Sequence, residues 1–267
     1  MSLLCRADKG REVNKLEQIR TYWEERGAAK SDGSLVTHRD ADQVSMETEL
    51  ILSLINEKDT LLDIGCGNGY STSLYSEKCK KVVGIDYARS MIEAATKHHC
   101  AENLRFERFD VLEMDERFGH FSVILTTRCL INFDTWERQQ EVIERIYNCL
   151  SDKGRLILVE GSQQGRKNIN DLRTRLGLPA MQPVWYNLDI DEDKLKPFVN
   201  KLFQVEKDIR FGLYDMLTRA YYPHSIKPKE PEYGTPFHKA ARELLQSLPK
   251  DPVPQYSREF VLVLRKR

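Results

Sequence analysis

The chain has 267 residues, with 41 Lys and Arg against 41 Asp and Glu, so its formal net charge is zero. Hydrophobic residues make up 40% and charged residues 31% of the chain, which excludes a disordered protein and a membrane-spanning one. Residues 1–10 lack the apolar region of a secretory signal. A protein that coats nucleic acid needs a strong basic footprint, and a net charge of zero does not provide one.

The cysteine and proline patterns add two expectations. Six cysteines form no Cys-x-x-Cys pair and no Cys/His cluster, so we expect reduced thiols, no metal site and a cytoplasmic location. All ten prolines lie between Pro179 and Pro254, and residues 1–159 are net acidic while the rest are net basic. The chain therefore divides into two regions of different composition.

Two amphipathic helices are predicted before residue 60. Residues 13–26 place apolar side chains at helical spacing, and Gly27 is a plausible stop. A polar stretch over residues 28–42 follows, and residues 44–56 form the second amphipathic segment. We expect residues 1–59 to be a helical cap.

From Thr60 onward, short apolar runs alternate with amphipathic helices. This alternation is typical of a parallel sheet with helices on both faces, and ligands bind at the carboxyl ends of its strands. The predicted strands are residues 60–64, 81–86, 104–110, 121–127 and 155–160. The predicted helices are residues 70–79, 89–99 and 134–150, the last with Asp134 as its N-cap.

The alternation stops after Gly161. Residues 168–176 and 191–200 are predicted helices, and residues 203–211 and 256–264 are predicted strands. The proline-rich segment between those two strands is rich in aromatic residues and contains a helix-like run, residues 237–248, which favours an ordered lid. We therefore expect a cofactor-binding core over residues 60–211, a lid or substrate insertion over residues 212–255, and a final core strand in residues 256–267.

The most informative segment is residues 61–70, with the sequence LLDIGCGNGY. A strand runs into three glycines at alternate positions, and a helix follows. Glycine permits positive φ and close approach of a ligand, and the helix N-terminus offers free N–H groups to an anionic group. Asp63 closes the first strand, and Asp86 closes the second, where an acid can accept both hydroxyls of a ribose.

This loop does not match the NAD fingerprint Gly-x-Gly-x-x-Gly, because the last position of that spacing is Tyr70. An acid before the first glycine has no role toward a pyrophosphate, but it can accept a hydrogen bond from an ammonium group. The loop is therefore predicted to bind a nucleoside joined to an amino acid, and not a dinucleotide.

Residues 61–161 resemble the class I S-adenosylmethionine-dependent methyltransferases. The matching segments are residues 63–69 (DIGCGNG), 83–91 (VGIDYARSM), 109–111 (FDV) and 150–156 (LSDKGRL). The resemblance implies an α/β fold with a doubly wound, mainly parallel, Rossmann-like seven-stranded sheet and an antiparallel terminal hairpin. It also implies S-adenosylmethionine as cofactor and S-adenosylhomocysteine as product.

The resemblance assigns roles residue by residue. The glycine loop would pass the methionine part of the cofactor, Asp86 would bind the ribose, and Asp110, at the end of the third strand, would accept from the adenine amino group. The cofactor-binding residues it implies are Asp63, Gly65, Cys66, Gly67, Asn68, Gly69, Asp86, Tyr87, Met91, Asp110, Val111, Thr127 and Arg128.

Methyl transfer needs few catalytic groups, because the methyl is already activated and the protein mainly aligns donor and acceptor. A general base helps only a poor nucleophile such as an alcohol. The candidate bases are His38, His224 and His238, and Arg128 is the candidate group to hold an anionic acceptor. Basic residues of the insertion stand beside aromatic residues, consistent with a flat or anionic small molecule and equally with solvated charge: Arg219, Lys227 and Lys229.

The sequence therefore predicts methyl transfer to oxygen or nitrogen of a small-molecule acceptor, with the proline-rich insertion as lid. Two alternatives stay open. A methyltransferase acting on RNA predicts a contiguous basic surface at the rim, and a protein side chain is a further possible substrate. A non-catalytic S-adenosylmethionine-binding protein predicts a cofactor site open to solvent. The acceptor, the base and the oligomeric state are not determined by the sequence.

Overall fold

A computed structural model describes residues 14–29, 38–226 and 233–267. Its centre is a seven-stranded sheet of order β3-β2-β1-β4-β5-β7-β6, in which β7 runs antiparallel to both of its neighbours and the other paired strands are parallel. The predicted α/β fold with its terminal antiparallel hairpin is confirmed. The strands are β1 (Thr60–Ile64), β2 (Lys81–Asp86), β3 (Leu104–Arg108), β4 (Phe121–Thr127), β5 (Leu150–Gly161), β6 (Phe203–Arg210) and β7 (Glu259–Lys266).

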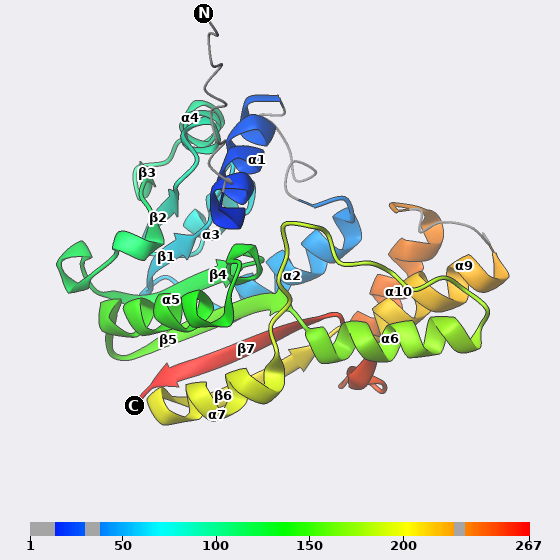
Figure 1. The fold of residues 1–267 in the computed structure, drawn as a ribbon. Coiled ribbons are helices and arrows are strands. Elements are labelled where there is room, and N and C mark those ends of the chain that lie inside the picture. Colours follow the sequence, from blue (N-terminus) through cyan, green and yellow to red (C-terminus); the bar gives the residue numbers. More distant parts are fainter. Residues whose placement is uncertain (1–13, 30–37, 227–232) are drawn as a thin grey trace, which may run out of the picture.

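Helices cover both faces of this sheet (Figure 1). Apolar residues of α5 and α7 pack on one face, and those of α2, α3, α8 and α10 pack on the other. The helices are α1 (Lys15–Ala29), α2 (Ala41–Leu54), α3 (Tyr70–Ser76), α4 (Arg89–His98), α5 (Trp136–Cys149), α6 (Gln163–Arg175), α7 (Glu192–Leu202), α8 (Gly212–Asp215), α9 (Tyr222–Ser225) and α10 (Pro236–Ser247).

The strand sequences explain the two buried faces. Successive side chains of a strand point to opposite sides, so Leu62 and Ile64 pack into one core while Leu61 packs into the other. Both faces of β1 must therefore be apolar, and the strand is a continuous apolar run broken only by Asp63. The strand order reverses between β1 and β4, which is the usual place for a ligand in an open α/β sheet.

Several predicted boundaries were wrong. Helix α1 continues through Gly27 to Ala29, because Gly27 packs on α4, where a Cβ would lie 2.4 Å from Ser90 Oγ. Thr135, and not Asp134, caps α5 and accepts from Arg138 N. Strand β3 ends at Arg108, and β5 begins at Leu150 through its pairing with Phe121.

The segment between β6 and β7 is helical and packed. It contains α8, a π-helix (η5, Met216–Tyr221), α9, α10 and the 3-10 turn η6 (Pro254–Tyr256). Helix α10 lies against α2, with Arg242 paired to Asp42 at 3.5 Å. Residues 28–29 of the predicted polar stretch belong to α1 and residues 41–42 to α2, while residues 30–37 and the predicted basic residues Lys227 and Lys229 lie outside the described residues.

Candidate active site at the carboxyl ends of the strands

The glycine loop between β1 and α3 requires glycine at its three alternate positions. Gly65, Gly67 and Gly69 have φ of 74°, 54° and 76°, a region that L residues with side chains rarely adopt. At Gly65 an added Cβ would also lie 2.8 Å from Cys129 Sγ. The amides of Gly65 and Cys66 both donate to the Ile85 carbonyl, at 2.8 and 3.0 Å, which holds the loop against β2.

A buried carboxyl, Asp63, and a half-buried one, Asp86, flank this loop. Asp86, at the end of β2, accepts from Gly67 N at 3.1 Å and from Ala88 N at 2.8 Å. Asp63, on β1, accepts from Thr72 Oγ1 at 2.5 Å. Burial raises the pKa of Asp86 to about 6, and burial together with the nearby Asp86 charge raises the pKa of Asp63 to about 7. A bound group that donates hydrogen bonds or carries positive charge would stabilise the ionised form of each carboxyl.

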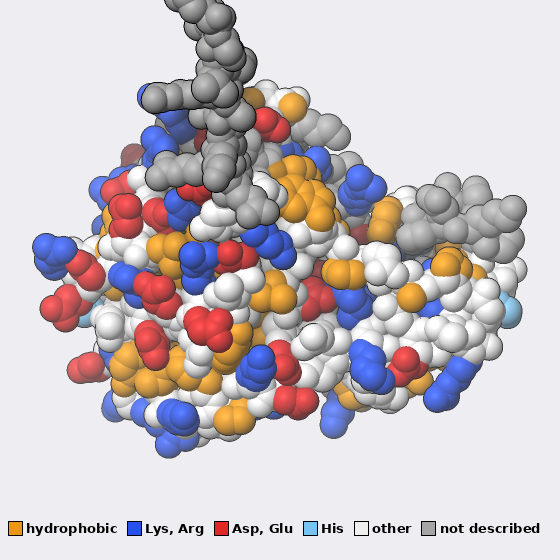
Figure 2. All heavy atoms as spheres, viewed as in Figure 1, with side chains coloured by type: hydrophobic (Ala, Val, Ile, Leu, Met, Phe, Trp, Pro, Cys, Tyr) orange, Lys and Arg blue, Asp and Glu red, His pale blue; other side chains and the backbone are white. Residues whose placement is uncertain are grey.

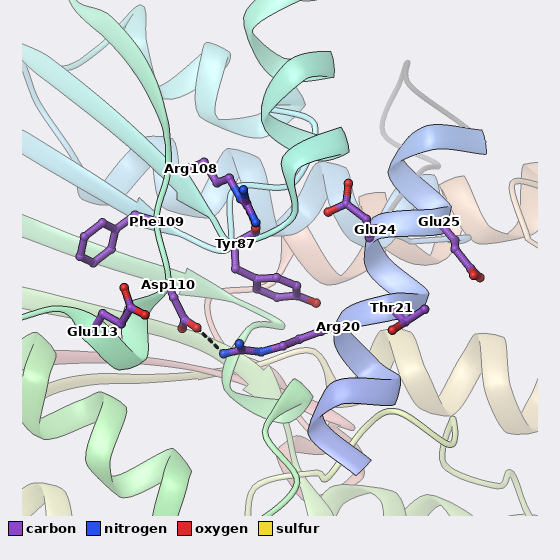
Figure 3. A pocket seen from close by; sticks show the side chains of 9 residues that line it. All are labelled: Arg20, Thr21, Glu24, Glu25, Tyr87, Arg108, Phe109, Asp110 and Glu113. Carbon is purple, nitrogen blue, oxygen red and sulfur yellow. Dashed lines mark hydrogen bonds and ion pairs between the residues drawn. The ribbon is translucent and has the colours of Figure 1, made fainter. Parts of the chain in front are cut away.

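A cavity of about 600 Å³ lies beside the ends of β2 and β3 and is closed on one side by α1 (Figure 3). Arg20 of α1 forms an ion pair with Asp110, and its guanidinium lies 5.4 Å from the centre of the Tyr87 ring. Asp110 also caps the 3-10 helix Val111–Glu113 by accepting from Leu112 N at 3.0 Å. Met91 is buried and packs against Tyr87 and Trp23.

The end of β4 is held by a buried carboxyl that the sequence analysis did not single out. Glu160, at the end of β5, accepts from Thr126 Oγ1 at 2.8 Å and from three successive amides after β4: Cys129, Leu130 and Ile131, at 3.2, 3.0 and 3.3 Å. Burial raises the pKa of Glu160 to about 7. Glu160 therefore fixes the direction in which the chain leaves the rim after β4.

Comparison with known proteins identifies this arrangement. Residues 55–201 match the family model described as a methyltransferase domain. The chain belongs to this methyltransferase family.

Individual relatives agree with this assignment. A carboxy-S-adenosyl-L-methionine synthase from Idiomarina loihiensis is 24% identical over 145 residues, which are 48% of this chain and 55% of that protein. The chain spans about half the length, or less, of the curated relatives it matches.

Solved structures share the fold at low sequence identity. Magnesium protoporphyrin IX methyltransferase from Synechocystis, solved with S-adenosylhomocysteine, has a TM-score of 0.59 at 13% identity and covers 95% of this chain and 100% of its own. The N-methyltransferase NodS from Bradyrhizobium japonicum, also solved with S-adenosylhomocysteine, has a TM-score of 0.57 at 13% identity and covers 93% and 98%.

Arg128 of this methyltransferase lies in a buried cluster of charges. It forms an ion pair with Glu47 of α2 and lies 3.9 Å from Glu259 of β7. Burial raises the pKa of Glu47 well above its usual range, whereas Arg128 and a hydrogen bond from Glu47 hold the pKa of Glu259 below its usual range in spite of burial. The raised pKa of Glu47 and the lowered pKa of Glu259 favour one negative charge shared by the two carboxyls opposite Arg128.

The structure brings one of the three candidate histidines to this cluster. His38 lies next to it, and Asp40 N donates to His38 Nδ1 at 3.2 Å. Burial and the nearby Arg128 lower the pKa of His38 to about 4, so the imidazole is neutral at pH 7. His224 is exposed on α9, and no contact joins it to His38 or Arg128 among the interactions of the described residues. His238 is buried on α10, where its Nδ1 lies 2.8 Å from Thr235 Oγ1.

Helix α1 contributes residues that the sequence analysis missed. Glu24 accepts from Arg89 N at 2.8 Å and Ser90 N at 2.9 Å at the start of α4, and Trp23 Nε1 donates to Asn132 Oδ1 at 2.8 Å. These contacts dock α1 over the cavity. Local sequence does not show that Glu24 caps a different helix. Trp23, in contrast, is a large aromatic residue on an amphipathic helix and could have been proposed as a contact residue.

Within residues 14–29, 38–226 and 233–267, no group of three or more His, Cys, Asp or Glu side chains could hold a metal ion. No helix there has the length and apolar character to cross a membrane.

Proposed function

We propose that this chain binds S-adenosylmethionine and transfers its methyl group to oxygen or nitrogen of a small-molecule acceptor. The observation that carries the proposal is the pair of carboxyls, the buried Asp63 and the half-buried Asp86, on either side of a loop whose three glycines have positive φ. One carboxylate suits the ammonium group of an amino acid and the other suits the hydroxyls of a ribose. Together they fit a nucleoside joined to an amino acid.

Unpartnered polar atoms support the fit of the cofactor. Among the described residues, the Tyr87 hydroxyl and Thr127 Oγ1 are buried and have no hydrogen-bond partner. Buried polar groups without partners are uncommon, and both lie on segments that the family resemblance assigns to the cofactor. In the proposal, the loop residues 65–69 hold the methionine part, Asp86 holds the ribose, and Tyr87, Met91, Asp110 and Val111 border the adenine.

The cofactor supplies a methyl group that is already activated on a sulfonium, so the protein's part is to orient the acceptor and exclude water. Thr127 ends β4, where it pairs with Val159 of β5, and Arg128 follows it. His38, neutral at pH 7, is the proposed group to accept a proton from the acceptor. Arg128 acts in this proposal by holding Glu47 and Glu259 in place beside it.

A small acceptor is favoured over RNA by the surface charge. On the face drawn in Figure 2, Lys and Arg side chains of the described residues alternate with Asp and Glu and form no continuous basic area. RNA binding draws on such an area. Incubation of the enzyme with cell extract and S-adenosylmethionine labelled in the methyl group should place label in the small-molecule fraction. Label confined to RNA or protein would contradict the proposed acceptor class.

Calorimetry with S-adenosylhomocysteine tests the cofactor site. Replacing Asp86 with alanine removes a half-buried acceptor of ribose hydroxyls, which costs about 1–3 kcal/mol and weakens binding roughly 5- to 150-fold. Asp152→Ala, which changes an exposed acid on β5, is the matched control and should bind as the wild type does. Equal affinity of the wild type and Asp86→Ala would contradict the ribose assignment.

A further inference from the structure

Three arginines, two of them buried and the third half-buried, meet between α2, α6, the π-helix η5 and the start of β7. Arg219 of η5 is 1% exposed and forms an ion pair with Asp40, which caps α2. Arg258 donates from its backbone and side chain to Asp215, at 2.7 and 2.8 Å. Arg173 of α6 is 4% exposed and donates to two backbone carbonyls, those of Pro179 and Arg219. We call these three residues the arginine group.

The arginine group carries more positive charge than its surroundings balance. Three guanidinium groups meet only two carboxylates, Asp40 and Asp215, and among the described residues Arg173 has no ion pair. Burial and the charges of Arg219 and Arg258 lower the pKa of Arg173. Glu259 adjoins Arg258 and lies 3.9 Å from Arg128, so Arg173 is the member of the arginine group without a carboxylate partner among the described residues. A buried, uncompensated charge is costly unless something pairs with it.

Arg219 also has free hydrogen-bonding capacity. Its Nη2 donates to Asp40, but its Nε and Nη1 are buried and make no hydrogen bond. The guanidinium lies 4.8 Å from the centre of the Tyr233 ring and 5.7 Å from that of Tyr214, so aromatic rings lie against it. A guanidinium has five N–H groups. Nε of Arg219 faces Asp215 Oδ1 at 3.9 Å, so the N–H groups on Nη1 are those left for an added carboxylate.

The arginine group adjoins the candidate active site. Asp40, the partner of Arg219, is two residues from His38 and donates to its ring. Tyr233, which lies over Arg219, is 37% exposed, so the group lies close beneath the surface. In Figure 2 the outline of the molecule is notched between the part that carries α1 and the part that carries α9 and α10. The arginine group is therefore connected to His38 through Asp40.

We propose that the arginine group binds a carboxylate of the methyl acceptor, so that the acceptor is a small carboxylic acid whose nucleophilic oxygen or nitrogen points toward His38. This inference rests on the proposed function, because it places the acceptor beside the cofactor site. It goes further by naming the chemical class of the acceptor and by assigning Arg219 as the residue that selects it.

The test compares acids with their neutral amides. The full-length protein, saturated with S-adenosylhomocysteine, is titrated with formate, acetate, benzoate and 4-hydroxybenzoate, each against its own amide, and the thermal midpoint is followed. We expect at least one acid to raise the midpoint, while its amide does not. If no acid of the series stabilises the protein more than its amide, the inference is overturned.

Substitutions of the arginines test whether the acid binds at the arginine group. Arg219→Gln should weaken binding of the stabilising acid roughly tenfold or more, because a charged hydrogen-bonding partner is lost. Arg173→Gln, which leaves the pair of Arg219 and Asp40 in place, should also weaken it. Arg155→Gln is the matched control, since Arg155 pairs with Asp59 at 3.1 Å, at the opposite end of the strands. An acid effect that survives both Arg219→Gln and Arg173→Gln would place the acid elsewhere and overturn the assignment.

Binding of S-adenosylhomocysteine, measured on every variant, distinguishes failure of the proposed function from failure of the proposed acceptor class. Variants that bind it with wild-type affinity are folded and have an intact cofactor site, so a lost acid effect then belongs to the arginine group. If the wild type itself does not bind S-adenosylhomocysteine, the proposed function fails. If it binds while no acid is preferred, only the acceptor class fails.

Discussion

Asp63 and Asp86 are carboxyls whose protonation and ligand binding must be linked. Burial raises the pKa of Asp86 to about 6 and, with the Asp86 charge, that of Asp63 to about 7. The proposed ligand needs both groups ionised, one for its ammonium and one for its hydroxyls. A ligand that prefers the ionised form lowers the pKa of these groups and releases protons when it binds.

We therefore predict that affinity for S-adenosylhomocysteine rises with pH between about 5.5 and 7.5 and levels off above that range. The sign follows because the free protein holds protons below the raised pKa values of about 6 and 7, and those protons must leave on binding. Calorimetry at pH 6.5 in two buffers of different ionisation enthalpy measures the proton release directly. Proton uptake, or affinity that does not change with pH, would contradict the prediction.

Glu47 and Glu259 share one negative charge opposite Arg128, so either carboxyl can supply it. We predict that Glu47→Gln and Glu259→Gln each change the free energy of unfolding by no more than about 1–2 kcal/mol, because the remaining carboxyl still pairs with Arg128. The double variant leaves Arg128 buried without a counter-charge and should lose about 3–5 kcal/mol. Urea unfolding of the four proteins measures this coupling, and additive losses would argue against a shared charge.

At the scale of elements, the sequence predicted those segments whose local pattern and tertiary role agree. The ranges of β1, β2 and β4 were predicted correctly, because each is a buried apolar run followed by turn residues. Gly27 misled the prediction of α1, because its packing on α4 requires a small residue inside the helix. Such a contact between distant segments leaves no local signal.

The residues of the candidate site also fall into those that local sequence predicts and those that it does not. The glycine loop, Asp63 and Asp86 follow from local sequence, since each lies at a predicted strand end. Glu47, Glu160 and Glu259 were missed, because an acid in the middle of a helix or next to a strand end is usually solvated. Only the arrangement of α2, β5 and β7 buries these three acids around the end of β4.

Helix α1 covers the proposed adenine pocket, and its Arg20 holds the carboxylate that the adenine amino group would use (Figure 3). The Arg20 side chain is 36% exposed, so its ion pair is worth at most about 1 kcal/mol. We predict that Arg20→Ala binds S-adenosylhomocysteine up to about fivefold more tightly.

Calorimetry measures this change, with Arg89→Ala as control, because Arg89 forms an exposed ion pair with Glu93 on α4. We expect Arg89→Ala to bind S-adenosylhomocysteine with wild-type affinity. Weaker binding by Arg20→Ala would mean that Arg20 supports the ligand and does not compete with it.

At the scale of the whole molecule, the proline-rich region is joined to the rest of the protein by buried polar contacts. The Asp40 carboxylate, before α2, accepts from the Tyr214 hydroxyl at 2.9 Å and from Arg219, while Asp215 accepts from Arg258 beside β7. We propose that residues 212–255 serve as a lid on the acceptor side. These contacts hold the described residues of that segment against α2 and β7.

This arrangement predicts that the region unfolds together with the sheet. Asp40→Ala leaves Arg219 buried without its partner and should cost about 3–5 kcal/mol, which lowers the thermal midpoint by roughly 6–20 °C for a chain of this size. Asp171→Ala, which breaks an exposed pair with Lys167 on α6, should cost less than about 1 kcal/mol. Calorimetric scans measure both. A single transition that shifts as a whole supports joint unfolding, whereas a separate early transition in Asp40→Ala would show that residues 212–255 unfold independently of the sheet.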